Sequence, residues 1–138
     1  MLEKTIKYTD YNGEEREETF LFNLSKAELT EWELTVEGGL TALITKISSE
    51  KRIPELTKLF KSLIMKAYGE KSPDGKRFIK SEDLSIAFTQ TGAYDELFMS
   101  FFDKENSGKN VSEFIAGILP GDLLNDSKVQ ALLNSYKE

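Results

Sequence analysis

The N-terminal part of the chain alternates between apolar and polar side chains. Apolar residues fall on even-numbered positions in two short runs, one on either side of the stretch "DYNGE". Because neighbouring side chains of a β-strand point to opposite faces, this spacing predicts two strands within residues 2–24, each with one buried face. The apolar residues expected to share that buried face are Leu2, Ile6, Tyr8, Phe20, Phe22 and Leu24.

The register of these two strands depends on the turn between them. A two-residue Asn-Gly turn would put the two apolar runs on opposite faces of the hairpin. A three-residue loop at 11–13 instead pairs Leu2 with Phe22 and puts both runs on one face. Asp10 and Gly13 occupy the first and fourth positions favoured by a type I turn with a glycine bulge. The sequence therefore predicts the three-residue loop.

After the hairpin, the apolar side chains change to helical spacing, three or four positions apart. Ser25 and Glu28 match the capping box that opens many helices. The segment "EKSPDGKR" is rich in turn-forming residues and is expected to be a polar loop between helices. The predicted helices run from Ser25 to about Thr35, from near Leu40, over about 53–67, from Ser81 to about Gln90, over 93–102, from Ser112 to before Pro120, and from Asp126 onward.

These elements predict an α+β fold that is mostly helical, with an N-terminal β-hairpin followed by six or seven short helices. The chain has 138 residues and is expected to form a single domain, with the hairpin at 1–24 and the helical part at 25–138. A lone hairpin is marginal in water, so its apolar face should pack on helices or on another subunit. Exposed Phe20 and Phe22 would instead mark a surface for self-association or for a client protein.

The residue types present exclude several kinds of chemistry. The chain has no cysteine and no histidine, which excludes thiolate chemistry, the usual zinc sites and nucleophiles activated by histidine. Its net charge of −6 argues against nucleic-acid binding by the whole surface. No apolar run is long enough to span a membrane, and "MLEKTIKYTD" is not a signal peptide. We therefore expect a cytosolic protein that binds neither nucleic acid nor membrane.

No motif in the sequence carries catalytic chemistry. The charged run "EEREE" at 14–18 either protects the edge of a strand or supplies a carboxylate pair for acid–base catalysis. Nothing nearby predicts the cleft that a catalytic pair requires. A non-catalytic binding protein without a cofactor is therefore expected.

The stretch "FFDKENSGKNVSEF" at 101–114 resembles a calcium loop between two helices. Asp103, Glu105 and Ser107 match the first, third and fifth ligand positions, and a glycine follows at the sixth. The twelfth position, which needs a bidentate glutamate, holds Phe114, and the nearby glutamate comes one residue early. On a helix, one residue turns a carboxylate by about 100°. The loop is only a weak candidate, and the sequence predicts no metal site.

Positive charge is concentrated in residues 51–80. This segment has nine basic and three acidic residues, so it carries +6 while the remainder carries −12. The pattern is typical of solvated helix faces, or alternatively of a basic surface for an acidic partner segment. Lys66 lies about 140° round the predicted helix from Lys61 and is expected to face elsewhere. The candidate partner-binding residues are Lys58, Lys61, Lys76 and Arg77.

Three segments carry a resemblance to a known family. They are "KTIKYTDYNGEEREETFLFNLSKAEL", "YGEKSPDGKRFIKSEDLSIAFTQTGAYDELFMSFF" and "EFIAGILPGDL". Over about residues 1–123, the chain resembles the tail assembly chaperones of long-tailed phages and prophages of Gram-positive bacteria. The resemblance implies a protein that binds the tape measure protein and keeps it soluble until the tail tube protein polymerises around it. It also implies action in the host cytoplasm and absence from the mature virion.

Two other functions stay open at this point. One is a calcium-binding helix-loop-helix regulatory module, and the other is a minor structural protein of the tail. A tail tube protein would need more strand than one hairpin, which disfavours the structural role. A chaperone is compatible with the predicted fold, because a tape measure protein is a long helical chain with apolar stripes. An amphipathic helix of that kind binds in a groove between helices.

Overall fold

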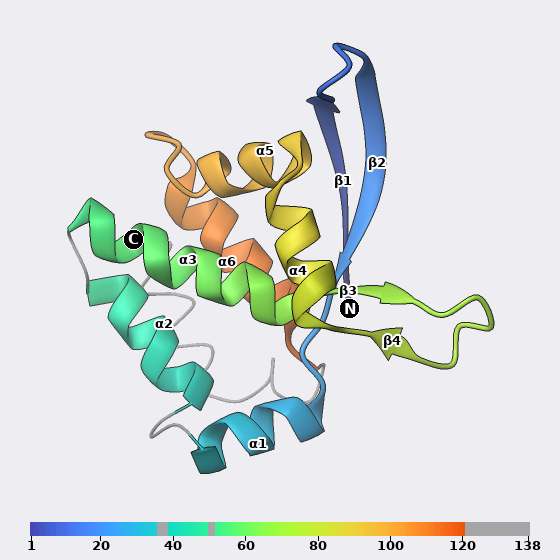
Figure 1. Cartoon of the computed structure of the whole chain (residues 1–138). Coiled ribbons are helices and arrows are strands. Elements are labelled where there is room, and N and C mark those ends of the chain that lie inside the picture. The colour runs from blue at the N-terminus through green and yellow to red at the C-terminus, as the bar shows by residue number, and fades with distance from the viewer. Residues whose placement is uncertain (36–38, 50–51, 121–138) are drawn as a thin grey trace.

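The computed structural model describes residues 1–35, 39–49 and 52–120 of the chain. Within these ranges, two N-terminal strands are followed by six helices and a second, shorter pair of strands (Figure 1). This arrangement confirms the predicted α+β, mostly helical fold. The predicted helix from Asp126 lies outside the described residues. The observed helices are α1 Lys26–Thr35, α2 Gly39–Ser49, α3 Ile53–Ala67, α4 Glu82–Thr89, α5 Gly92–Ser100 and α6 Ser107–Ile118.

The N-terminal hairpin has the predicted register. Strand β1 (Leu2–Thr9) pairs antiparallel with β2 (Glu15–Phe22), and Leu2 lies opposite Phe22. The backbone N–H of Gly13 donates to the carbonyl of Asp10 at 3.0 Å, and Gly13 has a φ of 80°. This left-handed conformation favours glycine and closes the three-residue loop. The prediction of a bulged type I turn is therefore confirmed.

Two short strands flank the polar loop predicted after α3 and form a second hairpin. Strands β3 (Tyr68–Lys71) and β4 (Phe78–Ile79) complete a sheet of order β1-β2-β3-β4. Tyr68 and Gly69 pair with the open side of β2, and a side chain at Gly69 would meet the ring of Phe78. The expected loop is present at 72–77, whereas the sequence does not predict the two flanking strands, because they are only four and two residues long. They depend on the neighbouring strand rather than on their own hydrophobic pattern.

The helix starts follow the predicted caps. The backbone N–H of Ser25 donates to Glu28 Oε1 at 2.9 Å, while the N–H of Glu28 donates to Ser25 Oγ at 3.1 Å. At the start of α4, the N–H of Leu84 donates to Ser81 Oγ at 3.0 Å. Both caps satisfy backbone donors that a helix leaves free at its N-terminus, so the sequence signals and the structure agree.

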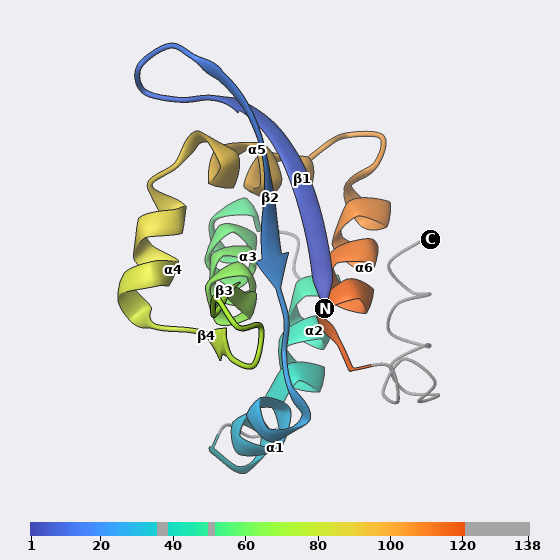
Figure 2. The same ribbon diagram turned by 90° about the vertical axis from the view of Figure 1, so that its right-hand side faces the viewer.

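The helices pack on one face of the sheet. Figure 2 shows β1 and β2 in front, with α3, α5 and α6 behind them. Phe22 is 0% exposed, and its ring lies 5.2–5.8 Å from the rings of Tyr68, Phe88 and Phe114. This aromatic cluster joins β2 to β3, α4 and α6. The tip of the β1–β2 hairpin projects beyond the helices (Figure 1).

Candidate functional site

The stretch that resembles a calcium loop forms the start of α6. Asp103 Oδ1 accepts the backbone N–H groups of Glu105 at 2.9 Å and Asn106 at 3.3 Å. Helix α6 begins at Ser107, five residues before the predicted start at Ser112, because this carboxylate accepts the backbone donors just before it. Among residues 1–35, 39–49 and 52–120, no three His, Cys, Asp or Glu side chains are grouped to hold a metal ion. The calcium alternative therefore gains no support from this loop.

A basic groove of about 690 Å³ lies between α3 and the start of α4. Lys58 and Lys61, two of the candidate partner-binding residues, line it from α3. The partly buried side chain of Met65 adds an apolar surface between them and the start of α4. We call this feature the α3–α4 groove, and its lining residues are Lys58, Lys61, Ser62, Met65, Lys66, Lys80, Ser81, Glu82 and Ser85.

The placement of Lys66 corrects one expectation. The 140° between Lys61 and Lys66 is real on an α-helix, but it sets them on the two flanks of one face. Ser62 and Met65 fall between them on that face, and all four line the α3–α4 groove. Lys66 Nζ also lies 4.6 Å from the centre of the Trp32 ring, a cation–π contact with α1. Lys66 thus belongs to the same surface as Lys58 and Lys61.

Lys80, which lines the α3–α4 groove just before α4, binds three other segments of the fold. Its Nζ donates to the carbonyl of Asn23 at 2.6 Å, to Glu28 Oε2 at 2.6 Å and to the carbonyl of Lys66 at 2.9 Å. These three acceptors belong to the residue that follows β2, to α1 and to α3. Ser85 Oγ adds a bond of 2.9 Å to the carbonyl of Met65. The start of α4 is therefore fixed against three other elements.

Glu28 is the charged partner of Lys80 at this junction. Burial opposes ionisation of Glu28, but hydrogen bonds from Lys80 and from Ser25 outweigh it and lower the pKa of the carboxyl. The carboxylate form is therefore the one that the fold stabilises. The junction carries a partly buried charge pair, whereas Lys58 and Lys61 on the groove are exposed, and Lys58 Nζ lies 3.8 Å from Glu55 Oε1.

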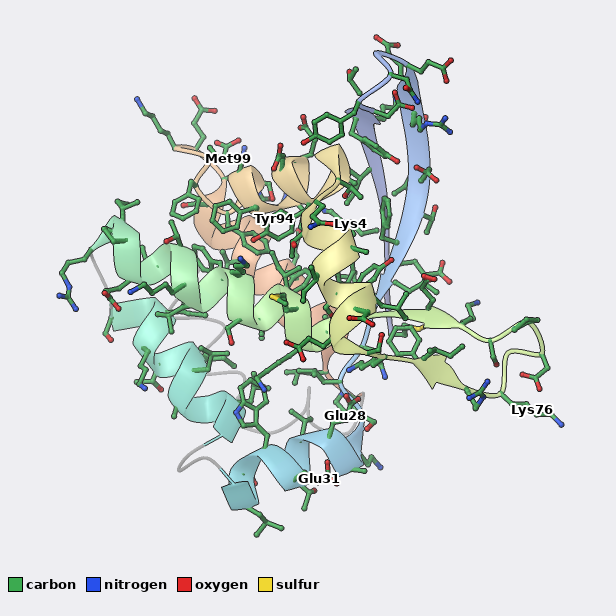
Figure 3. The ribbon with its side chains drawn as sticks, in the orientation of Figure 1. Lys4, Glu28, Glu31, Lys76, Tyr94 and Met99 are labelled. Carbon is green, nitrogen blue, oxygen red and sulfur yellow. The ribbon has the colours of Figure 1, made fainter. Side chains whose placement is uncertain are left out.

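The other two basic candidates lie elsewhere. Lys76 and Arg77 lie at the outer end of the β3–β4 hairpin, where Figure 3 labels Lys76. The backbone N–H of Lys76 donates to Asp74 Oδ1 and that of Arg77 donates to Ser72 Oγ, both at 3.0 Å. The hydrogen bond from Ser72 lowers the pKa of Asp74. This turn does not line the α3–α4 groove, so the structure separates the four basic candidates into two surfaces.

The two phenylalanines of β2 belong to the core. Phe22 is fully buried, and Phe20 is half-buried with its ring centre 5.1 Å from that of Phe88 and 6.3 Å from that of Tyr8. Core packing, as predicted for the apolar face of the hairpin, is confirmed. Neither ring is an exposed aromatic surface in this structure.

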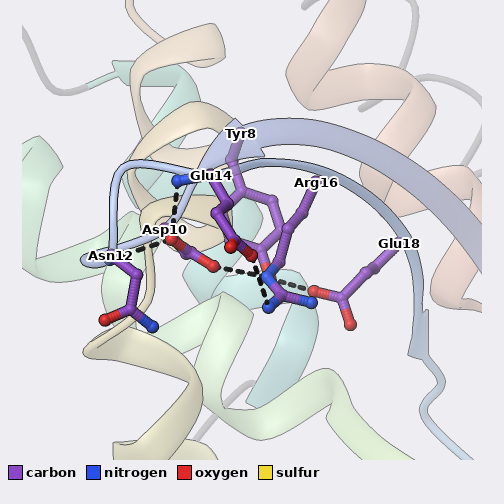
Figure 4. Close-up of polar contacts among 6 residues, drawn as sticks. All are labelled: Tyr8, Asp10, Asn12, Glu14, Arg16 and Glu18. Carbon is purple, nitrogen blue, oxygen red and sulfur yellow. Dashed lines mark hydrogen bonds and ion pairs between the residues drawn. The ribbon is translucent and has the colours of Figure 1, made fainter.

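Charged residues at the tip of the β1–β2 hairpin organise the turn (Figure 4). Asp10 Oδ1 accepts two backbone N–H groups of the turn at 2.9 and 3.0 Å, and Arg16 Nε donates to Asp10 Oδ2. The hydrogen bond from Arg16 lowers the pKa of Asp10. Tyr8 donates its hydroxyl to Glu18, and this bond raises the pKa of Tyr8. The cluster stabilises a tight turn through paired groups.

Sequence reasoning did not identify several residues of the α3–α4 groove. Lys58, Ser62 and Met65 are spaced by four and three residues, so the helical period could have grouped them on one face. Lys80 lies just before α4 and Ser85 lies within it, and their approach to α3 depends on tertiary packing. No local pattern in the sequence signals that approach.

Comparison with known proteins identifies the family. Within the described ranges, no helix has the length and hydropathy needed to cross a membrane. No curated protein and no solved structure matches the chain. The sequence profile of a family described as phage tail assembly chaperone matches residues 1–137, including the C-terminal stretch that lay beyond the resemblance noted above. The chain therefore belongs to the phage tail assembly chaperone family.

Proposed function

We propose that this chaperone binds the tape measure protein without catalysing any reaction, and that the α3–α4 groove is the binding site. It keeps the client soluble in the host cytoplasm while the tail tube protein polymerises, and it leaves before the virion is complete. The observation that supports this proposal is the groove itself, which combines a partly buried methionine with a rim of lysines.

The chemistry of the α3–α4 groove suits an amphipathic helix with acidic residues beside its apolar stripe. Met65 and the methylene stems of the rim lysines offer apolar contact, while the lysine ammonium groups stay in water. Apolar burial supplies most of the affinity, because an exposed ion pair contributes only about 0–1 kcal/mol. The lysines mainly set the orientation of the helix and the rate of association.

The test is co-expression of the chaperone with the tape measure protein of the same phage. Lys58→Glu/Lys61→Glu reverses two charges on the groove, and Lys76→Glu/Arg77→Glu is a matched control at the β3–β4 turn. We expect the groove variant to bind the client at least about tenfold more slowly at low salt. We also expect it to leave more client insoluble, while the control behaves like the parent protein. Circular dichroism should show both variants folded.

Two results would contradict the assignment. If Lys76→Glu/Arg77→Glu alone lost client capture, the binding site would lie at the β3–β4 turn. If both variants captured the client normally, the basic residues of 51–80 would lie on solvated helix faces and would not contribute to client binding.

A further inference from the structure

Strand β1 forms one edge of the four-stranded sheet. The backbone N–H of Asp10 donates to the carbonyl of Glu14 at 2.9 Å, so the even-numbered residues of β1 turn their backbone groups toward β2. The odd-numbered residues turn theirs to the open side. Among residues 1–35, 39–49 and 52–120, no backbone hydrogen bond reaches these groups of Glu3, Thr5 or Lys7. This edge can pair with another strand.

The side chains on the outer face of β1 have an ordered pattern of charge. Glu3, Thr5 and Lys7 are all exposed, two residues apart, on the face opposite the helices. Along β1 the order is acid, hydroxyl, base. An antiparallel copy of the strand presents the opposite order, so its base lies opposite the acid. An antiparallel copy of β1 is therefore electrostatically complementary to β1 itself.

We propose that two copies of this chain associate through antiparallel pairing of their β1 strands, with the two-fold axis at Thr5. Hydrogen bonding across this edge requires odd-numbered residues to face odd-numbered residues. With Thr5 opposite Thr5, each Glu3 faces Lys7 of the second copy, which gives two attractive pairs. A shift of two residues in either direction removes both pairs, since Thr5 then faces Glu3 or Lys7. The charge pattern thus selects one register.

The geometry of the sheet limits this association to a dimer. A two-fold axis uses the same edge of both copies and leaves no further β1 edge free. The opposite edge of the sheet is β4, which is only two residues long, Phe78–Ile79. Charged residues along β1 also disfavour pairing with an unrelated apolar strand. The second copy is therefore the partner that this edge fits, and the contact does not depend on the client.

The test is sedimentation velocity of the full chain over a range of protein concentrations. The parent protein should show a monomer–dimer equilibrium. Glu3→Lys and Lys7→Glu each replace two attractive contacts by two repulsive ones, and each should raise the dissociation constant about tenfold or more. Combining Glu3→Lys with Lys7→Glu exchanges the charges and should restore the parent dissociation constant. Glu15→Lys, on the neighbouring strand β2, is the matched control and should have no effect.

The combined variant separates this contact from effects within one chain. Lys7 Nζ also lies 4.0 Å from Glu17 Oε2 of its own hairpin, and Lys7→Glu loses this pair whether or not Glu3 is changed. Recovery in the combined variant can therefore come only from the contact between copies. A monomer at every concentration would overturn the proposal. So would single variants that dimerise like the parent, or a combined variant that does not recover.

Discussion

At the scale of single residues, Phe22 joins more parts of the core than its neighbours in β2 do. Its ring contacts aromatic rings from β3, α4 and α6, and it has no exposed surface. Phe22→Ala should lower the free energy of unfolding by about 3–5 kcal/mol, because a buried ring is lost and a cavity remains. Urea denaturation followed by circular dichroism measures this change.

Phe20 provides the comparison for that experiment. It is half-buried and lies two residues from Phe22, on the same face of β2. Phe20→Ala should destabilise the fold clearly less than Phe22→Ala, because less apolar surface leaves the core. Equal stability of Phe22→Ala and the parent protein would contradict the core assignment of the ring.

At the scale of elements, Lys80 connects the residue after β2, helix α1 and helix α3 to the start of α4 through its three hydrogen bonds. Lys80→Met keeps a side chain of similar length but leaves two carbonyls and the carboxylate of Glu28 without this donor. We expect a loss of about 2 kcal/mol in the free energy of unfolding, since hydrogen bonds to charged groups are stronger than neutral ones. Chemical denaturation of the purified variant measures the loss.

Lys76→Met is the matched control for Lys80→Met. The side chain of Lys76 is exposed at the β3–β4 turn, so its replacement should change stability by no more than about 0.5 kcal/mol. If Lys80→Met and Lys76→Met were equally stable, the three hydrogen bonds of Lys80 would not stabilise the start of α4.

The elements that could be predicted from the sequence are those whose determinants are local. The bulged turn at Gly13 and the capping box of Ser25 and Glu28 depend on neighbours within a few residues, and both are confirmed. Strand β3 depends on the open side of β2, which is distant in the sequence. The two sides of the α3–α4 groove differ in the same way. Its α3 side follows the helical period, while its α4 side depends on the long-range contacts of Lys80.

At the scale of the whole molecule, charge is distributed unevenly over a chain that is acidic in total. Residues 51–80 carry the positive charge and supply much of the α3–α4 groove, whereas acidic residues follow the turn of the β1–β2 hairpin. The net charge of −6 opposes aggregation of the chaperone at high concentration. The local excess of lysine is what our proposal of an acidic client helix rests on.

The stability of the whole fold should depend on the charge of Glu28. The fold lowers the pKa of this carboxyl below its ordinary value of 4.5. The unfolded chain therefore takes up a proton at a higher pH than the folded chain does, and stability is lost as the pH falls through the folded pKa.

Glu28→Gln removes the charge but keeps the side-chain oxygen that the capping box needs. The variant should be less stable than the parent at neutral pH, and the difference should shrink below pH 4.5. Urea denaturation of both proteins at several pH values measures this difference, with Glu33→Gln on the exposed side of α1 as the control. A difference that stayed constant from neutral to acidic pH would mean that the ionised carboxylate of Glu28 does not stabilise the junction with Lys80.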